Sequence, residues 1–166
     1  MRLNRVVREP TMFPNKSKKT WALFAILMFL NIFAVLQDAS GQSNRSPQAL
    51  EYFKRSLECL IVGDYDNTIL NCSLALRFDP NSAVTFTVRA RAHYEKGDMD
   101  NAIADCTQAI RYDLNNISAY SIRGNAYGRL GNFDRAIADW EAILRLNPEN
   151  NDALQNIELV RLKRDG

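Results

Sequence analysis

The sequence has few of the residues on which catalytic and metal sites are usually built. Its 166 residues include one histidine, His93, and three cysteines, Cys59, Cys72 and Cys106. A single histidine without neighbouring acids or thiols does not make a zinc site or activate a nucleophile. The odd number of cysteines and the lack of a C-x-x-C motif argue against redox catalysis. Phosphate-binding loops, paired-glycine motifs and nucleophile elbows are also missing, so we expect no enzyme, no cofactor and no metal site.

The chain also lacks a basic cluster outside its first residues. Residues 1–41 hold six Lys and Arg against two acidic residues, which leaves 15 basic and 17 acidic residues for the remainder. Nucleic-acid binding requires clustered Lys and Arg that displace counterions from the phosphates. A slightly acidic body without such a cluster argues against nucleic acid as a partner. Its 46% apolar and 24% charged residues are typical of a folded domain.

One apolar run stands out, at residues 21–36, and only Asn31 interrupts it. As a helix it would span roughly 24 Å at about 1.5 Å per residue, short of the ~30 Å hydrocarbon core. Basic residues precede the run, and Ala39, Ser40 and Gly41 follow it, which is the order of a signal peptide cleaved after Gly41. An uncleaved signal anchor is the alternative, because tilt or bilayer thinning accommodates a short span. Both interpretations predict export, with the remaining chain in the periplasm or at the cell surface.

The beginning of the chain has two interpretations as well. The basic lead before the apolar run is 20 residues long, which is more than a signal peptide usually has. Initiation at Met12 instead of Met1 would leave a lead of ordinary length. If the run at 21–36 is retained, it attaches the chain to a membrane. Burial of the run inside the soluble fold is a third interpretation, which its lack of helical amphipathicity disfavours.

The rest of the sequence repeats with a period of 34 residues, which predicts three units at 49–82, 83–116 and 117–150. Two rows of residues recur at this spacing: Gly63, Gly97 and Gly131, and Asp66, Asp100 and Asp134. Each unit has the pattern of a helix, a Gly-centred turn and a second helix. Glycine permits the positive φ at which the first helix ends, and the aspartate favours the positive dipole end of the second helix.

Local signals delimit the helices at both ends of this array. After a linker at 42–48, the pair Ser46-Pro47 predicts the start of the first helix, with the serine as cap and the proline in the opening turn. Pro80 and Pro148 stop the second helices of their units. Arginines complement the negative dipole end of the same helices. They are Arg77, Arg111 and Arg145.

These residues resemble the tetratricopeptide repeat, and the match covers residues 49–150 almost without gaps. The family's large fourth residue is Tyr52, Phe86 and Tyr120, and its small eighth residue is Ser56, Ala90 and Gly124. The resemblance implies an all-α fold, a right-handed α-solenoid of three helix-turn-helix repeats. A solvating, capping helix at 151–166 would cover its last apolar face, and the hydrophobic signal or anchor helix would precede it. Leu114 and Ile143 depart from the pattern, and Ile143 implies altered spacing against the cap.

An arginine occupies the seventh place of each unit, where the family usually has leucine. Sixteen residues later, on the second helix, the units carry an amide or a carboxylate. The pairs are Arg55 with Asn71, Arg89 with Asp105, and Arg123 with Asp139. Arginine and carboxylate at a helix–helix seam form bidentate hydrogen bonds, so we predict a repeated internal ion pair that is weakest in the first unit. The pattern resembles an Arg-Gly variant common in bacterial sequences; a row of arginines that binds an anionic ligand is the alternative.

The remaining polar and sulfur residues fit structural places in this scheme. His93 lies at the eleventh place of its unit, which is normally packed between helices. Cys72 and Cys106 share the 24th place, where cysteine acts as a small apolar filler. Cys59 and Cys72 lie on adjacent helices and have the option of pairing in an oxidising compartment, but sequence does not establish the geometry.

In this family the first helices line a concave groove that contacts partners. The resemblance assigns these contacts to Leu50, Phe53, Lys54, Leu57, Leu60, Ile61, Val84, Thr87, Val88, Arg91, Tyr94, Ser121, Ile122, Asn125 and Arg129, together with Glu95, Ser118 and Gly128. Chaperone-binding members grip a C-terminal carboxylate with Lys, Asn and Arg. The matching places here are Phe53, Leu57, Val88, Ser118 and Ile122, so that clamp is absent.

The apolar character of the first unit points to a binding surface. An amphipathic helix or an extended apolar peptide would suit it. We therefore predict an exported or membrane-tethered scaffold or assembly adaptor that binds a protein or peptide partner. Two alternatives stay open: the chain's own residues 42–48, its membrane-proximal segment or a second copy covers the surface, or the groove accepts an apolar small molecule or lipid.

Overall fold

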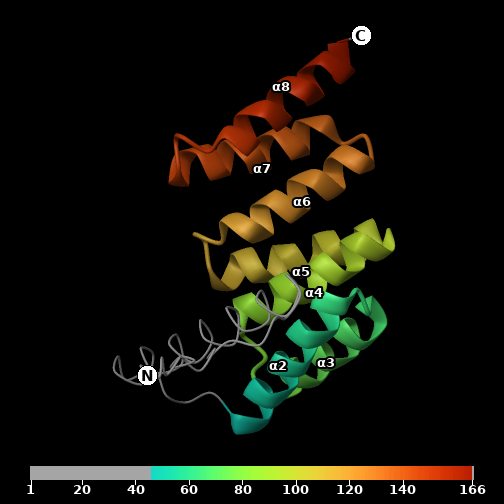
Figure 1. The fold of residues 1–166 in the computed structure, drawn as a ribbon. Helices are drawn as coiled ribbons and strands as arrows, with labels where there is room; N and C mark the ends of the chain where they lie inside the picture. The colour runs from blue at the N-terminus through green and yellow to red at the C-terminus, as the bar shows by residue number, and fades with distance from the viewer. Residues whose placement is uncertain (1–45, 166) are drawn as a thin grey trace, which may run out of the picture. The chain divides into compact units, whose positions relative to one another are not determined.

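The computed structural model describes residues 46–165 of the chain. That range holds seven helices and no strand: α2 (Pro47–Val62), α3 (Tyr65–Phe78), α4 (Ala83–Lys96), α5 (Met99–Tyr112), α6 (Ile117–Arg129), α7 (Phe133–Leu146) and α8 (Asn151–Asp165) (Figure 1). None of these helices is long and apolar enough to span a membrane. The predicted signal or anchor segment at 1–41, its apolar run at 21–36 and the alternative start at Met12 lie outside the described residues.

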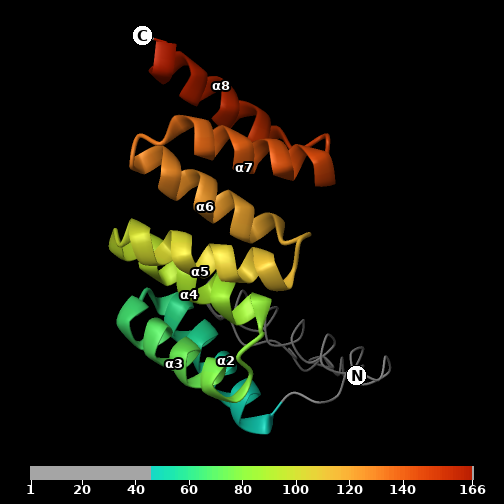
Figure 2. The ribbon, with the colours of Figure 1, turned by 180° about the vertical axis from the view of Figure 1, so that it is seen from behind.

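The helices pack as consecutive antiparallel pairs, followed by one single helix (Figures 1 and 2). α2 packs on α3, α4 on α5 and α6 on α7, and α8 covers α7. Neighbouring pairs are joined because α3 packs on α4 and α5 on α6. The first helices of successive pairs also meet, α2 with α4 and α4 with α6. The predicted all-α solenoid of three helix pairs with a C-terminal capping helix is confirmed.

Glycine makes each tight turn inside a pair possible. Gly63, Gly97 and Gly131 have φ values of 82°, 86° and 75°, in the left-handed region that a side chain would resist. At the first turn the N–H of Gly63 donates to the Leu60 carbonyl at 3.1 Å, and the N–H of Asp64 to the Cys59 carbonyl at 2.9 Å. These bonds satisfy carbonyls at the helix end that have no partner within the helix. The predicted Gly-centred turns are confirmed.

Two of the three second helices, α3 and α5, begin with a side-chain cap that the sequence analysis did not identify. Asp66 and Asp100 lie in the first turns of α3 and α5 as predicted, but the caps are Asp64 and Asp98, two residues earlier. Asp64 accepts from the Asn67 backbone N–H at 3.1 Å and from the Asn67 side chain at 2.7 Å. Asn67 holds the pKa of Asp64 below its usual value, mainly through the hydrogen bond from its side chain and also through the one from its backbone N–H. The carboxylate is therefore the form that the helix end favours.

The first helices after α2 share one capping rule. Ser82, Asn116 and Asn150, which recur every 34 residues, accept from the N–H of Thr85, Ala119 and Ala153. α8 therefore begins in the register of the first helix of a fourth unit. α2 differs, because the Ser46 hydroxyl bonds to the Gln48 side chain at 2.6 Å and caps no backbone N–H. The predicted helix start at Ser46-Pro47 is confirmed, but the predicted capping bond of the serine side chain is wrong, and Pro47 and Gln48 of the predicted linker are helical.

One contact in each pair sets how closely its helices approach. The eighth residue of each unit faces the 24th: Ser56 with Cys72, Ala90 with Cys106, and Gly124 with Trp140. Cys72, Cys106, Ser56 and Ala90 are fully buried, and Trp140 is 3% exposed. A Cβ on Gly124 would lie only 2.9 Å from Trp140 Nε1. The third unit therefore fits the largest side chain of this series against the smallest residue, which keeps the packing dense.

α8 closes the array on one side only. Its Ala153, Ile157 and Val160 are buried in a cluster with Trp140 and Ile143 of α7. Its other side exposes apolar side chains, at Leu154, Leu159 and Leu162. The cap therefore covers the last apolar face as predicted, and its outer surface combines exposed charged residues such as Glu158 and Arg161 with these three leucines.

Candidate functional site

The arginine row is bonded inside the fold in the second and third units. Arg89 donates from Nε and Nη2 to both oxygens of Asp105 at 2.7 Å each. Arg123 holds Asp139 in the same way, at 2.9 and 2.7 Å. The predicted internal ion pairs are confirmed here. Each guanidinium also bonds to the preceding unit, which the sequence analysis did not predict. Arg89 Nη1 donates to Ser73 of α3 at 3.0 Å, and Arg123 Nη1 donates to Thr107 of α5 at 3.1 Å.

The first unit lacks this tie, as predicted. Arg55 bonds to the Glu51 carboxylate on its own helix at 3.0 Å, and both side chains are largely exposed. Asn71 donates to the Asn67 carbonyl at 2.8 Å and makes no hydrogen bond to Arg55 within the described residues. Since two of the three arginines are saturated by carboxylates, the row serves to join helices. An anion-binding row of arginines therefore has no geometric support.

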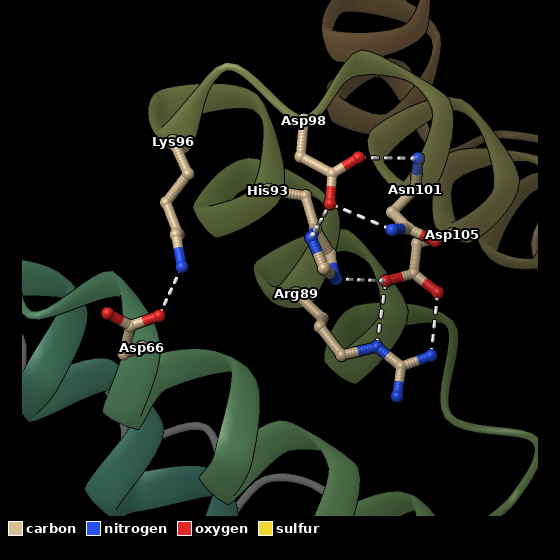
Figure 3. Close-up of polar contacts among 7 residues, drawn as sticks. All are labelled: Asp66, Arg89, His93, Lys96, Asp98, Asn101 and Asp105. Atoms are coloured by element: carbon tan, nitrogen blue, oxygen red, sulfur yellow. Dashed lines mark hydrogen bonds and ion pairs between the residues drawn. The ribbon is translucent and has the colours of Figure 1, made fainter.

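His93 lies between two carboxylates (Figure 3). Its Nδ1 donates to Asp98 at 3.1 Å, and its Nε2 is 4.0 Å from the Asp105 oxygen that Arg89 binds. Asp98 also accepts from Asn101, whose side chain holds the pKa of Asp98 below its usual value. The expectation that His93 has no neighbouring acid is wrong. The ring is half-buried between α4 and α5, where it joins the end of one helix to the cap of the next.

The buried thiols offer no reactive group. All three cysteines are free, so the pairing considered for Cys59 and Cys72 is not formed. Burial raises the pKa of Cys72 to about 11 and that of Cys106 to about 12. Both are therefore thiols at neutral pH, whereas the thiolate is the nucleophile and the metal ligand. Among residues 46–165 no group of three His, Cys, Asp or Glu side chains is placed to hold a metal ion.

The structure places the fifteen predicted partner-contacting residues on the first helices α2, α4 and α6, and we call this surface the groove. Leu50, Ile61, Val84, Arg91 and Arg129 are exposed. Phe53, Lys54, Leu57, Leu60, Thr87, Val88, Tyr94, Ser121 and Asn125 are half-buried. Ile122 alone is buried, in a cluster with Ala90 and Cys106, and it reaches the surface only as part of a cleft wall.

The groove is divided by chemistry along the array. Its α2 and α4 side is apolar, and a narrow cleft between these helices is lined by Leu50, Phe53 and Val84. Its α6 side is polar and opens into a cleft of about 220 Å³ between α6 and α8. Ser118, Ser121 and Ile122 of α6, Arg91 of α4 and Asn156 of α8 line that cleft.

Two side-chain pairs order the middle of the groove. Arg91 Nε donates to Glu95 at 2.7 Å along α4. The guanidinium carbon of Arg129 lies 4.1 Å above the centre of the Tyr94 ring, so α6 and α4 are joined by a cation–π contact. The sequence analysis assigned these residues to the groove but did not predict the stack. It also missed Asn156, although the recurring cap at Asn150 indicates that α8 continues the row of first helices.

Comparison with known proteins identifies what the chain is similar to. The tetratricopeptide repeat family model matches residues 117–150, and a second TPR repeat model matches residues 90–131. No curated protein matches the sequence. Among solved structures, the first TPR of Spaghetti (RPAP3) bound to the HSP90 peptide SRMEEVD is 27% identical, with a TM-score of 0.71 over 76% of this chain and 100% of that one.

Two further solved structures support the same relationship. The second TPR of Spaghetti (RPAP3), also bound to an HSP90 peptide, is 30% identical, with a TM-score of 0.60 over 65% of this chain and 99% of that one. The second TPR domain of human RPAP3, in complex with the HSP70 peptide SGPTIEEVD, is 29% identical, with a TM-score of 0.66 over 69% and 95%.

Proposed function

Because the chain belongs to the tetratricopeptide repeat family, we propose that it is a protein-interaction scaffold that binds a partner segment in its groove. The apolar side of the groove carries this proposal. Seven apolar side chains on the adjoining helices α2 and α4 are exposed or half-buried: Leu50, Phe53, Leu57, Leu60, Ile61, Val84 and Val88. Single exposed apolar residues are ordinary on protein surfaces, whereas a continuous set usually marks an interaction site.

The partner differs in chemistry from the peptides of the relatives. Their peptides, SRMEEVD and SGPTIEEVD, are acidic at the C-terminal end. The places that match the carboxylate clamp of chaperone-binding repeats carry Phe53, Leu57, Val88, Ser118 and Ile122 in this chain. None of these side chains is charged, so a terminal carboxylate would lose water there without gaining an ion pair. An amphipathic helix or an extended apolar segment fits this surface better.

A peptide-display selection against the full-length chain in mild detergent tests the proposal. We expect enrichment of peptides rich in Leu, Phe or Ile, and no saturable binding of labelled SRMEEVD. The double substitution Phe53→Ser and Leu57→Ser should weaken the selected peptides about tenfold or more, because buried apolar side chains dominate such interfaces. Leu70→Ser removes an exposed leucine of α3 outside the groove and should leave the affinity unchanged.

Two results would contradict peptide binding. If the double variant changes the oligomeric state in light scattering while no peptide is enriched, a second copy covers the groove. If native mass spectrometry of protein from its own host shows a bound small mass, the groove holds a ligand. The second alternative has less support, because the α6–α8 cleft of about 220 Å³ is smaller than the ~300–1,000 Å³ of typical small-molecule sites.

We also propose that the repeats act outside the cytoplasm, on the basis of the apolar run at 21–36 and its basic lead. N-terminal sequencing of the protein from its host should return Gln42 if the signal is cleaved after Gly41. An intact lead would instead indicate a membrane anchor. An alkaline phosphatase fusion at the C-terminus should be active in either case, and an inactive fusion with stable expression would exclude export.

A further inference from the structure

We propose that the partner segment carries an acidic side chain beside its apolar part, and that Arg129, stacked on Tyr94, binds this carboxylate. This inference rests on the proposed function, because it specifies the chemistry of the same partner. It concerns a residue on the far side of the groove from the apolar patch of α2 and at a different place from the missing carboxylate clamp.

Arg129 is held in an orientation suited to a planar anion. It is exposed in the last turn of α6, and its guanidinium carbon lies over the Tyr94 ring, 4.1 Å from the ring centre. Its Nη1 also reaches the Tyr94 carbonyl at 3.5 Å. These two contacts use one of the five guanidinium N–H donors and leave the others available. A fork fixed in this way loses little further freedom when it binds a carboxylate.

The charges on the concave places leave Arg129 without a counter-ion. Of the charged residues there, Arg91 and Glu95 neutralise each other at 2.7 Å. Within residues 46–165, neither Lys54 nor Arg129 forms an ion pair. Asp79 and Asp152 line the clefts at the two ends of the groove, so the unpaired positive charge is local to Lys54 and Arg129. This local charge favours an acidic group on the partner beside Arg129.

The position of Arg129 along the groove predicts where the acidic side chain of the partner lies relative to its apolar residues. Leu60 and Ile61 of α2, Tyr94 of α4 and Arg129 of α6 all lie in the last two turns of their helices. These ends lie on one side of the array, since Lys96 at the end of α4 pairs with Asp66 just after α2, and Arg129 spans from α6 to α4. A segment that crosses the groove at this end meets Leu60 and Ile61, then the Tyr94 ring, then the guanidinium. The partner therefore needs apolar residues first and a carboxylate next to them.

Arg129 also has a structural role, because its charge favours the C-terminal end of α6 and its guanidinium contacts Tyr94. A control substitution must therefore remove a similar contact without removing the proposed anion receptor. Arg135 provides it, because its guanidinium lies 5.6 Å from the Tyr127 ring and is exposed on α7, away from the groove. Arg135→Gln removes one charge and one stacked guanidinium, as Arg129→Gln does. Only Arg129→Gln removes the proposed anion receptor.

The experiment is the same display selection, made with the full-length wild-type chain, Arg129→Gln and Arg135→Gln. For the wild type and Arg135→Gln we expect the selected peptides to be enriched in Asp or Glu next to the apolar residues. For Arg129→Gln we expect the acidic enrichment to disappear while the preference for apolar residues stays. A selected peptide is then synthesised as a C-terminal amide with Glu or Gln at that position. Glu should bind the wild type about three- to tenfold more tightly, as an exposed charged hydrogen bond allows, and the ratio should fall with salt.

The other outcomes distinguish a failure of the Arg129 inference from a failure of the proposed function. The inference fails if acids are not enriched for the wild type, if their enrichment survives Arg129→Gln, or if binding requires a free C-terminal carboxylate in place of an acidic side chain. The proposed function fails separately, when no apolar peptide is enriched or when the Phe53→Ser and Leu57→Ser double variant binds normally.

Discussion

Replacing Asp139 by Ala is expected to lower the free energy of unfolding by about 3–5 kcal/mol, because it leaves a buried guanidinium without its counter-ion. Arg123 donates twice to this carboxylate, and the side chains of Arg123 and Asp139 are only 18% and 6% exposed. Water therefore has little access to the unpaired charge. Urea unfolding followed by circular dichroism measures the change.

The first unit supplies the matched control for this ion pair. Arg55→Ala breaks the Arg55–Glu51 pair, whose side chains are 57% and 58% exposed, and exposed pairs contribute about 1 kcal/mol or less. The double substitution Arg123→Met and Asp139→Leu should recover much of the loss, because apolar side chains of similar volume often replace a buried pair without cost. An Asp139→Ala loss no larger than that of Arg55→Ala would show that the seam is not held by its charges.

Trp140→Ala should cost about 3–5 kcal/mol, the usual loss for a buried large aromatic side chain. The indole is 3% exposed and lies in the cluster that joins α7 to α8, with Ile143, Ile157 and Val160. Its removal would leave a cavity in the contact between α7 and α8. Trp140→Phe should cost less, because it keeps a ring and removes an indole N–H that is buried without a hydrogen-bond partner among the described residues. Thermal or urea unfolding of the three proteins compares the losses.

Gly124 tests the same contact from the opposite helix. Alanine favours a helix by about 1 kcal/mol over glycine, yet the added Cβ would lie 2.9 Å from Trp140 Nε1 and 3.3 Å from Asp139 Cβ. We expect Gly124→Ala to destabilise by about 1–3 kcal/mol through overpacking. At Gly128 the nearest atom to such a Cβ is Trp140 Cη2 at an ordinary 3.7 Å, so Gly128→Ala should stabilise instead. Equal effects at the two glycines would exclude a steric origin.

The regular part of the fold was predictable because one spacing controls several interactions at once. A period of 34 residues aligns the turn glycines, the helix pairs and the Arg89–Asp105 and Arg123–Asp139 bonds. Positive φ at glycine and charge pairing between helices depend on residue type and register, both of which sequence contains. The predicted weakness of the first unit followed from one amide, Asn71, in place of a carboxylate.

The features that sequence analysis missed depend on how the helices are arranged in space. Ser73 and Thr107 bond to arginines of the following unit, and no pattern within one unit indicates that contact. The caps at Asp64 and Asp98 were overlooked because the aspartates two residues later also fit a helix start. The Arg129–Tyr94 stack requires knowledge of how adjacent first helices are turned toward each other. The groove residues were assigned from family resemblance, which gave their order along the surface. It did not show that the α2 and α4 side is apolar and the α6 side polar.

The missing arginine tie in the first unit has a consequence for how tightly any partner is held. Arg89 fastens α3 to the second unit through Ser73. Within residues 46–165 no arginine–carboxylate pair joins α2 to α3, and the bond in its place is the long one from Asn71 Nδ2 to Cys59 Sγ at 3.9 Å. α2 nevertheless supplies Leu50, Phe53, Leu57, Leu60 and Ile61, most of the apolar side of the groove. Regions with fewer such ties open locally more readily, so we expect α2 to open more readily than α4 or α6, the first helices of the other two units. The apparent affinity for a partner therefore includes the equilibrium that keeps α2 docked, and the partner in turn acts as the missing tie.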